Sequence, residues 1–362
     1  MNFDHRHYIP CLRWKQGEYL AVSRLPDTTK RMFTALIEVP ELGYDFEERK
    51  EKKTIDEHLA RFPKRVFDNW GDCPCFVDLG LIKADKRLAN GTHPIRFVFN
   101  KLRVMQCQCT PVTGLLRDTE YQQETQLALE QDKRGICLRI TIEQAAKTSF
   151  KRKLDSLLSM LGIRASDCDL ILDLGAPNFV PPEGFSKIIQ NIVCGLPYLS
   201  NWQTFTILGT SFPPTMAGIK RGGEVVPRYE WRLYKMLVAS LRKANLRLPT
   251  FGDYTISHPQ VLDMDMRLLK PNATIKFTID EGWYIAKGNN VKDYGYQQFH
   301  GLSEHVLASR HYRDSTFSWG KEYIRKCANR SAKRGNLTKW VQVGTNHHIA
   351  KVTEDIASFY AS

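Results

Sequence analysis

Four acidic residues lie in or beside short apolar runs, where an unpaired charge is costly to bury. Asp78 lies in CFVDLGL and Asp173 in DLILDLGA, and the two share the order D-L-G. Glu38 ends the run TALIE, and Asp253 follows a glycine that lets the backbone turn sharply. Carboxylates gathered in this way perform acid–base catalysis or bind a divalent metal. We therefore take these four residues as the candidate catalytic set, and Asp253 as its best member.

A structural explanation competes with the catalytic one. The same carboxylates would be satisfied by a salt-bridged core with Arg139 or Lys15 as the partner, and the sequence alone favours this explanation. For Asp253 the alternative is the capping of a turn. Further polar residues fall where strands are expected to end or near the C-terminus. These rim candidates are Lys15, Glu18, Arg139, Tyr254 and His347.

A basic stretch near the C-terminus could hold a polyanion. Residues 310–340 contain nine basic and two acidic side chains, a net charge of +7 within a chain of net charge +13. Aromatic side chains among such cations can stack on bases while the cations hold phosphates. The alternative is a solvated helix face that keeps the chain soluble. The candidate nucleic-acid-binding residues are Arg310, Arg313, Trp319, Lys321, Arg325, Lys326, Arg330, Lys333 and Arg334.

Eight β-rich runs alternate with helical runs over the first 256 residues. This rhythm is typical of an α/β protein with a (β/α)8 barrel, whose strands end at a common mouth. An open doubly wound sheet would also alternate, but no G-x-G-x-x-G turn follows the first strand. The strands are expected at residues 8–14, 34–39, 75–81, 105–112, 136–142, 169–174, 204–210 and 248–256. The mouth would then gather the candidate carboxylates.

The remaining sequence departs from this rhythm. Residues 273–287 predict a β-hairpin, 296–310 a helix, 339–343 a strand and 348–360 a last helix. We therefore divide the chain into a barrel domain, residues 1–271, and a basic appendage packed on it, residues 272–362. The appendage is too short to be expected to hold a core of its own.

Composition excludes several protein classes. The chain is 42% hydrophobic and 25% charged, as expected of a folded soluble protein rather than a disordered one. It has no apolar run long enough for a membrane helix and no signal-peptide core, so we expect no membrane partner and a cytoplasmic location. Among nine cysteines, the spacing C-x-C at Cys73/Cys75 and Cys107/Cys109 is unlike that of zinc sites. No cofactor is evident, although a divalent metal at the carboxylates is one option.

Several motifs together resemble the Beta protein family. They are YIPCLRWKQGE (8–18), LIEVP (36–40), GDY (252–254), WYIAKG (283–288), FSWG (317–320) and Trp340 to NHH (346–348). The resemblance extends over nearly the whole chain. It implies a protein of phages or of bacterial mobile and defence-linked loci, without a catalytic assignment. The positions that match the family are Lys15, Glu18, Glu38, Asp253, Arg310, Trp319 and His347.

Three functional hypotheses follow. The first is a protein of phage–host conflict that binds nucleic acid, or a nucleic-acid-processing partner, through its basic appendage. The second is a barrel hydrolase, with or without a metal, acting on a phosphate-containing substrate. It predicts that Asp253→Asn lowers the rate while the fold remains stable. The third is a protein-interaction subunit without catalysis.

Overall fold

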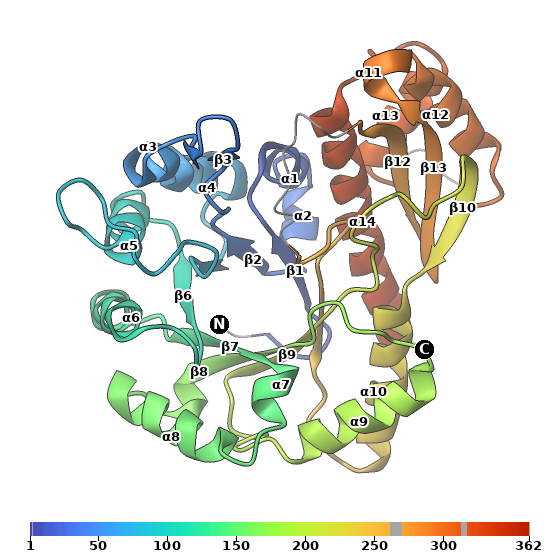
Figure 1. The fold of residues 1–362 in the computed structure, drawn as a ribbon. Coiled ribbons are helices and arrows are strands. Elements are labelled where there is room, and N and C mark those ends of the chain that lie inside the picture. Colours follow the sequence, from blue (N-terminus) through green and yellow to red (C-terminus); the bar gives the residue numbers. More distant parts are fainter. Residues whose placement is uncertain (2, 261–269, 313–316, 362) are drawn as a thin grey trace.

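The core of the protein is a closed barrel of eight parallel strands, shown in a computed structural model that describes residues 1, 3–260, 270–312 and 317–361 (Figure 1). The prediction of a (β/α)8 barrel is confirmed. Each strand lies within or close to one of the eight predicted runs. In chain order they are β1 (Tyr8–Leu12), β2 (Ala35–Glu38), β5 (Cys75–Asp78), β6 (Cys109–Thr113), β7 (Ile136–Thr141), β8 (Cys168–Asp173), β9 (Thr204–Leu208) and β11 (Thr250–Asp253).

Successive side chains of each strand point alternately into and out of the barrel, and this separates two apolar layers. Inward-facing side chains such as Cys11, Leu36, Phe76 and Ile171 meet in one cluster that fills the barrel. Their sequence neighbours face outward and pack under the surrounding helices. Both layers are buried, so the strands read as nearly continuous apolar runs, as parallel strands usually do.

Helices follow the barrel strands and cover their outer faces (Figure 1). Between β1 and β2 the chain forms two helices, because Pro26 lacks a backbone N–H and sets the start of the second one. The helices are α1 (Gln16–Val22), α2 (Asp27–Lys30), α3 (Ile55–Leu59), α4 (Phe62–Trp70), α5 (Pro94–Val104), α6 (Thr119–Asp132), α7 (Ile142–Ala145), α8 (Phe150–Leu161), α9 (Pro182–Cys194) and α10 (Tyr229–Lys243). A 3-10 turn spans Ala165–Asp167, and a small hairpin joins β3 (Tyr44–Asp45) to β4 (Lys50–Glu51).

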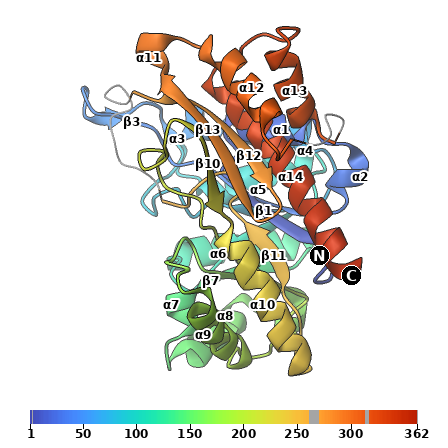
Figure 2. The ribbon, with the colours of Figure 1, turned by 90° about the vertical axis from the view of Figure 1, so that its right-hand side faces the viewer.

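A second unit stands beside the barrel (Figure 2). It has a three-stranded antiparallel sheet of β10 (Gly222–Pro227), β13 (Gly282–Asn290) and β12 (Asn272–Ile279). The predicted hairpin corresponds to β12 and β13. Helices α11 (Val291–Tyr294), α12 (Gln298–Ala308) and α13 (Trp319–Ala328) accompany this sheet. The strand β10 comes from the range assigned to the barrel, so the two units share a sheet; the boundary at residue 271 stays a prediction.

The last helix, α14 (Leu337–Ala361), belongs to both units (Figure 2). Its first half packs Trp340 and Val343 into a hydrophobic core of the appendage, so the expectation that the appendage has no core of its own is wrong. Its second half packs Ile349 and Val352 against the barrel layer. The predicted strand at 339–343 is therefore wrong. Five residues with alternating polarity are too few to define a strand, whereas the buried positions of the whole segment recur at helical spacing. The predicted helix at 348–360 is the second half of α14.

Helix α14 lies where a barrel needs the helix that follows its eighth strand. It packs against α1 and also contacts β1. Residues 272–336 therefore form an insertion between the eighth strand and the eighth helix. Within the part of the chain that the structure describes, no helix is long and apolar enough to cross a membrane.

Candidate functional site

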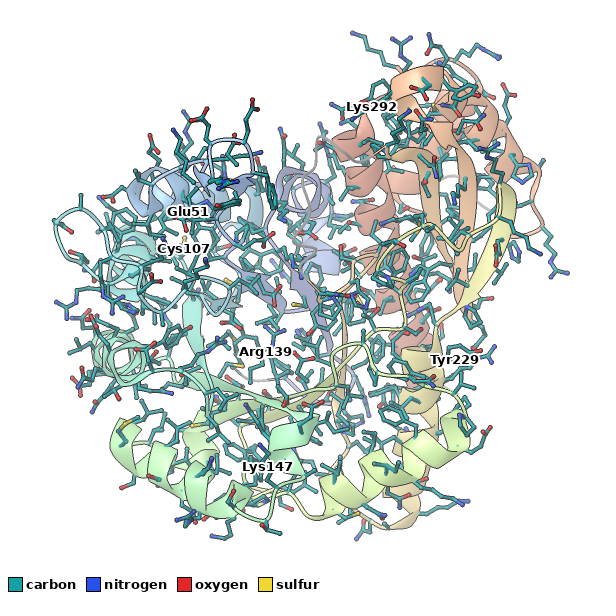
Figure 3. The ribbon with its side chains drawn as sticks, viewed as in Figure 1. Glu51, Cys107, Arg139, Lys147, Tyr229 and Lys292 are labelled. Atoms are coloured by element: carbon teal, nitrogen blue, oxygen red, sulfur yellow. The ribbon has the colours of Figure 1, made fainter. Side chains whose placement is uncertain are left out.

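The Arg139 guanidinium occupies the centre of the barrel mouth (Figure 3). Its Nη1 donates to Glu38 Oε1 and to Asp78 Oδ2, both at 2.8 Å. Its Nε donates to Asp173 Oδ2 at 2.9 Å, and its Nη2 donates to the Tyr254 hydroxyl at 2.9 Å. Three of the four candidate carboxylates and the rim candidate Tyr254 thus meet at Arg139, which is itself a rim candidate.

Strand alternation explains why these side chains converge. Phe76, Cys137 and Ile171 fill the barrel interior, and the residues two positions later in their strands are Asp78, Arg139 and Asp173. Residues i and i+2 point to the same side of a strand. The charged side chains therefore lie directly above the apolar plug, at the carboxyl ends of the strands, where barrel proteins place their active sites.

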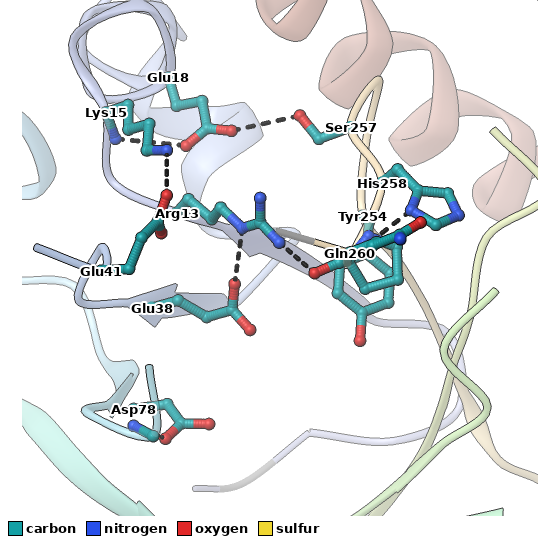
Figure 4. Close-up of polar contacts among 12 residues, drawn as sticks. Arg13, Lys15, Glu18, Glu38, Glu41, Asp78, Tyr254, Ser257, His258 and Gln260 are labelled. Carbon is teal, nitrogen blue, oxygen red and sulfur yellow. Dashed lines mark hydrogen bonds and ion pairs between the residues drawn. The ribbon is translucent and has the colours of Figure 1, made fainter. Parts of the chain in front are cut away.

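Two further arginines, which sequence reasoning missed, complete the cluster. Arg117 Nη2 donates to Asp78 Oδ1 at 2.9 Å, and Arg13 Nε lies 3.7 Å from Glu38 Oε2 (Figure 4). Arg13 also donates to the Pro259 carbonyl. Arg13 follows the inward Cys11 by two residues, so alternation could have identified it. Arg117 comes from the loop after β6, and no sequence signal points to it.

The repeated D-L-G order has a structural meaning. Asp78 Oδ1 accepts from the backbone N–H of Gly80 at 2.7 Å, and Asp173 Oδ1 accepts from that of Gly175 at 2.8 Å. Each aspartate thus closes a tight turn at the end of its strand. A Cβ on Gly80 would lie 2.0 Å from Arg117 Nη1, so the glycine makes room for that guanidinium. The turns fix both carboxylates toward Arg139.

The charge cluster sets the protonation of its members. Burial would raise the pKa of Asp78, but Arg117 and Arg139 hold it below its ordinary value. Burial and then Asp173 raise the pKa of Tyr254 well above its ordinary value. Tyr254 therefore stays protonated and donates to both oxygens of Asp173, at 2.8 and 2.7 Å. At neutral pH the mouth therefore holds an ionised Asp78 and a neutral Tyr254 phenol.

A cavity of about 550 Å³ opens above this cluster. Its walls include Arg117, Arg139 and Tyr254, together with Glu143 and Gln144 from the start of α7. Glu143 is exposed and has no hydrogen bond or ion pair within the described residues. This volume is in the range of pockets that take small molecules.

The residues at the mouth do not fit a divalent metal. In the described ranges, no three histidine, cysteine or acidic side chains are placed to hold a metal ion. The place between the carboxylates, where a metal would bind, is taken by the guanidinium of Arg139. The thiols of Cys75 and Cys109 lie 3.4 Å apart but are buried between two strands. The salt-bridged arrangement with Arg139 is therefore the one that is present.

Asp253 does not reach the mouth. Its neighbours Gly252 and Tyr254 face inward, so alternation turns Asp253 outward beneath α14. There its Oδ2 lies 2.9 Å from His348 Nε2, and its Oδ1 accepts from the Tyr8 hydroxyl at 2.5 Å. His348 Nδ1 lies 2.9 Å from the Thr278 hydroxyl. This Thr–His–Asp chain is fully buried, so it cannot meet a substrate and joins the appendage to the barrel instead.

The other rim candidates lie apart from the Arg139 cluster. Glu18 is buried, and burial raises its pKa to about 7; its oxygens lie 3.4 Å from the Lys15 N–H and from the Ser257 hydroxyl (Figure 4). The Lys15 amine binds Glu41 at 2.8 Å. His347 lies in the appendage, where it contacts the Thr278 carbonyl. Burial lowers the pKa of His347 to about 3, so it stays neutral.

The basic stretch divides into packed and exposed side chains. Trp319 packs on the core of the appendage between the cations of Arg24 and Lys339, and Lys321 is buried among aromatic rings. Acidic partners hold three of the cations: Arg325 and Lys326 contact Glu322, and Arg330 contacts Glu304. The exposed candidates with no ion pair among the described residues are Arg310, Lys333 and Arg334. Arg313 lies outside the described residues.

Solved structures with a similar arrangement are remote in sequence. They include a triosephosphate isomerase from Bartonella henselae (11% identity, 68% of this chain and 91% of that chain, TM-score 0.32). The carboxyl transferase domain of pyruvate carboxylase from Rhizobium etli has 10% identity over 95% of this chain and 49% of that chain, with a TM-score of 0.36. A class V chitinase from Pseudomonas fluorescens has 12% identity over 89% of this chain and 99% of that chain, with a TM-score of 0.30. No curated protein matches the chain. The family model described as Beta protein matches residues 8–354, nearly the whole chain, so this protein belongs to the Beta protein family.

Proposed function

We propose that this protein acts in phage–host conflict as a binding protein, and that the mouth of its barrel takes a small polar ligand. The observation that carries this proposal is the set of side chains that Arg139 gathers under a cavity of about 550 Å³. Three carboxylates are paired with three arginines there, and Glu143 in the wall adds a fourth carboxylate, which has no ion pair within the described residues. Such a site favours a ligand rich in hydroxyl or amide groups, which can both donate and accept hydrogen bonds. The biological setting comes from the family resemblance.

The same geometry favours binding over hydrolysis. Hydrolysis needs one group that takes a proton from water and a second group that protonates the leaving atom. A carboxylate can take the proton from water, but Asp78 is held ionised by its lowered pKa, and Tyr254 already donates its proton to Asp173, so neither is placed to protonate a leaving atom. The hydrolase and the protein-interaction subunit remain alternative predictions of the function. The cytoplasmic location also stays a prediction.

The binding proposal is tested with Tyr254→Phe. A panel of sugars, nucleosides and their phosphates is screened by thermal shift, and each hit is titrated by calorimetry. We expect at least one compound to bind the wild type, and Tyr254→Phe to weaken it about tenfold, since one hydrogen bond to a charged network contributes roughly 1.5 kcal/mol. The matched control is Tyr294→Phe, which alters an exposed tyrosine on α11. Equal affinity of Tyr254→Phe and wild type for every hit would refute the proposal.

A second candidate function is binding of nucleic acid on the exposed part of the basic stretch. It is favoured by Lys333 and Arg334, which are exposed and carry no ion pair within the described ranges. We expect Lys333→Ala/Arg334→Ala to lower the slope of log affinity against log salt by about 2, because each phosphate contact contributes about 0.9. Arg325→Ala should change the slope less, since Glu322 already holds that cation.

Binding to labelled single- and double-stranded DNA and RNA across a salt series measures this slope. The control variant is Lys64→Ala/Lys151→Ala, two exposed lysines on the barrel helices α4 and α8. An unchanged slope in the Lys333/Arg334 variant, or an equal loss in the control, would show that the charge of this stretch is not a binding surface.

A further inference from the structure

A second cavity adjoins the mouth. It has a volume of about 330 Å³ and lies between the loops that follow β5 and β6. It shares Gly80, Leu116 and Arg117 with the mouth cavity, so the two are neighbours across one arginine side chain. The second cavity also reaches Lys83 and His93. Together the cavities form a site longer than the mouth alone.

Arg117 has donors to spare on this boundary. Its Nη2 is bound to Asp78, and its guanidinium lies 5.2 Å from the centre of the Tyr121 ring, which holds it in place. The structure gives Nε and Nη1 no hydrogen-bond acceptor among the described residues. The side chain is 24% exposed. An arginine fixed in this way presents its remaining N–H groups to a ligand that lies across the boundary.

In the second cavity cations outnumber acids, two to one, whereas acids outnumber cations in the lining of the mouth. Lys83 is exposed and has no ion pair in the described part of the chain. The one acid in its wall, Asp118, accepts from the backbone N–H of Tyr121 as the cap of α6. Burial lowers the pKa of His93, which therefore stays neutral at physiological pH. Lys83 and Arg117 thus provide two cations for an anionic group.

We infer that the ligand is a phosphorylated sugar, free or within a nucleotide, whose hydroxyl groups lie in the mouth and whose phosphate lies between Arg117 and Lys83. This inference rests on the proposed binding at the mouth and adds the class of the ligand. Sugar hydroxyls can donate to the carboxylates of the mouth, which still have lone pairs to offer. A phosphate has more acceptor oxygens than a carboxylate, so it can accept from the remaining N–H groups of Arg117 and from the Lys83 amine at the same time.

Matched pairs of compounds test the inference by calorimetry at low salt. The probes are ribose 5-phosphate, glucose 6-phosphate and AMP, each beside its unphosphorylated partner, ribose, glucose and adenosine. For at least one pair we expect the wild type to bind the phosphorylated compound at least tenfold more tightly. Lys83→Gln should remove most of the ratio between the two affinities of a pair. It should leave the affinity for the unphosphorylated partner unchanged. Arg117→Gln should also abolish the ratio. Lys64→Gln, an exposed lysine on α4, should change neither affinity.

Gly80→Ala gives an independent check that preserves every charge. The added Cβ would lie 2.0 Å from Arg117 Nη1, so the guanidinium must move away from its place. We expect this variant to lose the preference for phosphate and still to bind the unphosphorylated partner, while its midpoint of unfolding falls, because the displaced guanidinium leaves its ion pair with Asp78.

The outcomes separate this inference from the proposed function. If Asp173→Asn weakens a ligand but Lys83→Gln and Arg117→Gln leave the phosphate ratio unchanged, the mouth binds and the second cavity does not, which refutes the inference alone. If no phosphorylated compound binds better than its partner, the inference is also refuted. If Tyr254→Phe and Asp173→Asn have no effect on any ligand, the proposed function fails with it.

Discussion

Arg139→Met is expected to destabilise the protein by about 3–5 kcal/mol at pH 7.5. The substitution removes the cation that binds Glu38, Asp78 and Asp173, while the three carboxylates stay at the mouth. Breaking a buried ion pair from one side is costly because the remaining charge has lost both water and its partner. Methionine keeps most of the volume, so the loss measures charge rather than a cavity. Urea unfolding followed by fluorescence gives the change in free energy.

The pH dependence of this loss identifies its cause. In the wild type the pKa of Asp78 is lowered on folding, so its contribution to stability is present above its unfolded pKa and is lost only as the pH falls through the lower, folded value. In Arg139→Met, Asp173 keeps no cation, whereas Arg117 still pairs with Asp78 and Arg13 with Glu38, so we expect burial to favour the protonated form of Asp173. The folded variant then binds more protons than the unfolded chain does, and this contribution to stability falls as the pH rises.

Unfolding at pH 5.0 and pH 7.5 compares the two proteins. Groups such as Glu18 and His347 make the stability of both proteins depend on pH, so the informative quantity is the difference between them: Arg139→Met should lose less stability relative to the wild type at pH 5.0 than at pH 7.5. The control is Arg164→Met, which removes an arginine that is 82% exposed and paired with Asp167. This control substitution should lower the free energy of unfolding by less than about 1 kcal/mol at both pH values. A loss in Arg139→Met that is independent of pH would mean that the carboxylates are satisfied without the arginine.

The barrel could be predicted from the sequence because its signal is repeated eight times. Each strand is a short apolar run followed by a helix, so an error at one boundary does not change the fold. The same rhythm places Glu38 at the end of a predicted strand and Asp78, Arg139 and Asp173 within three others. The prediction of a salt-bridged core around Arg139, given as the alternative to catalysis, matches the contacts that are present.

The placement of Asp253 failed for a reason that is itself visible in the sequence. The glycine before it suggests that the carboxylate is aimed at the mouth. However, side chains along a strand point alternately inward and outward, and Tyr254 is the one that points inward. By contrast, Arg117 could not be predicted, because its loop brings it to Asp78 only in three dimensions. Pairing of His348 with Asp253 is equally long-range, across 95 positions of the chain.

The second large effect is expected at this buried pair. Asp253 and His348 are both fully buried, and Asp253 also accepts from Tyr8 and from the backbone N–H of Thr255. Burial would raise the pKa of Asp253, but His348 holds it below its ordinary value. We expect Asp253→Leu and His348→Leu each to lower the free energy of unfolding by about 3–5 kcal/mol, since each leaves a buried polar partner unsatisfied. This reverses the expectation of the hydrolase hypothesis, in which Asp253 affects rate and not stability.

A double-mutant cycle separates the pair from its surroundings. If the two side chains stabilise each other across the junction of barrel and appendage, Asp253→Leu/His348→Leu should cost at least about 2 kcal/mol less than the sum of the single variants. The control pair is Lys151 and Asp155, which are exposed on α8 and should show a coupling below about 0.5 kcal/mol. Additive losses would mean that the two sites act independently. A large coupling would mean that a polar contact of Asp253, next to Tyr254, holds α14 to the barrel. Because Tyr254 lines the mouth, the insertion between the eighth strand and its helix would then help to set the position of this residue.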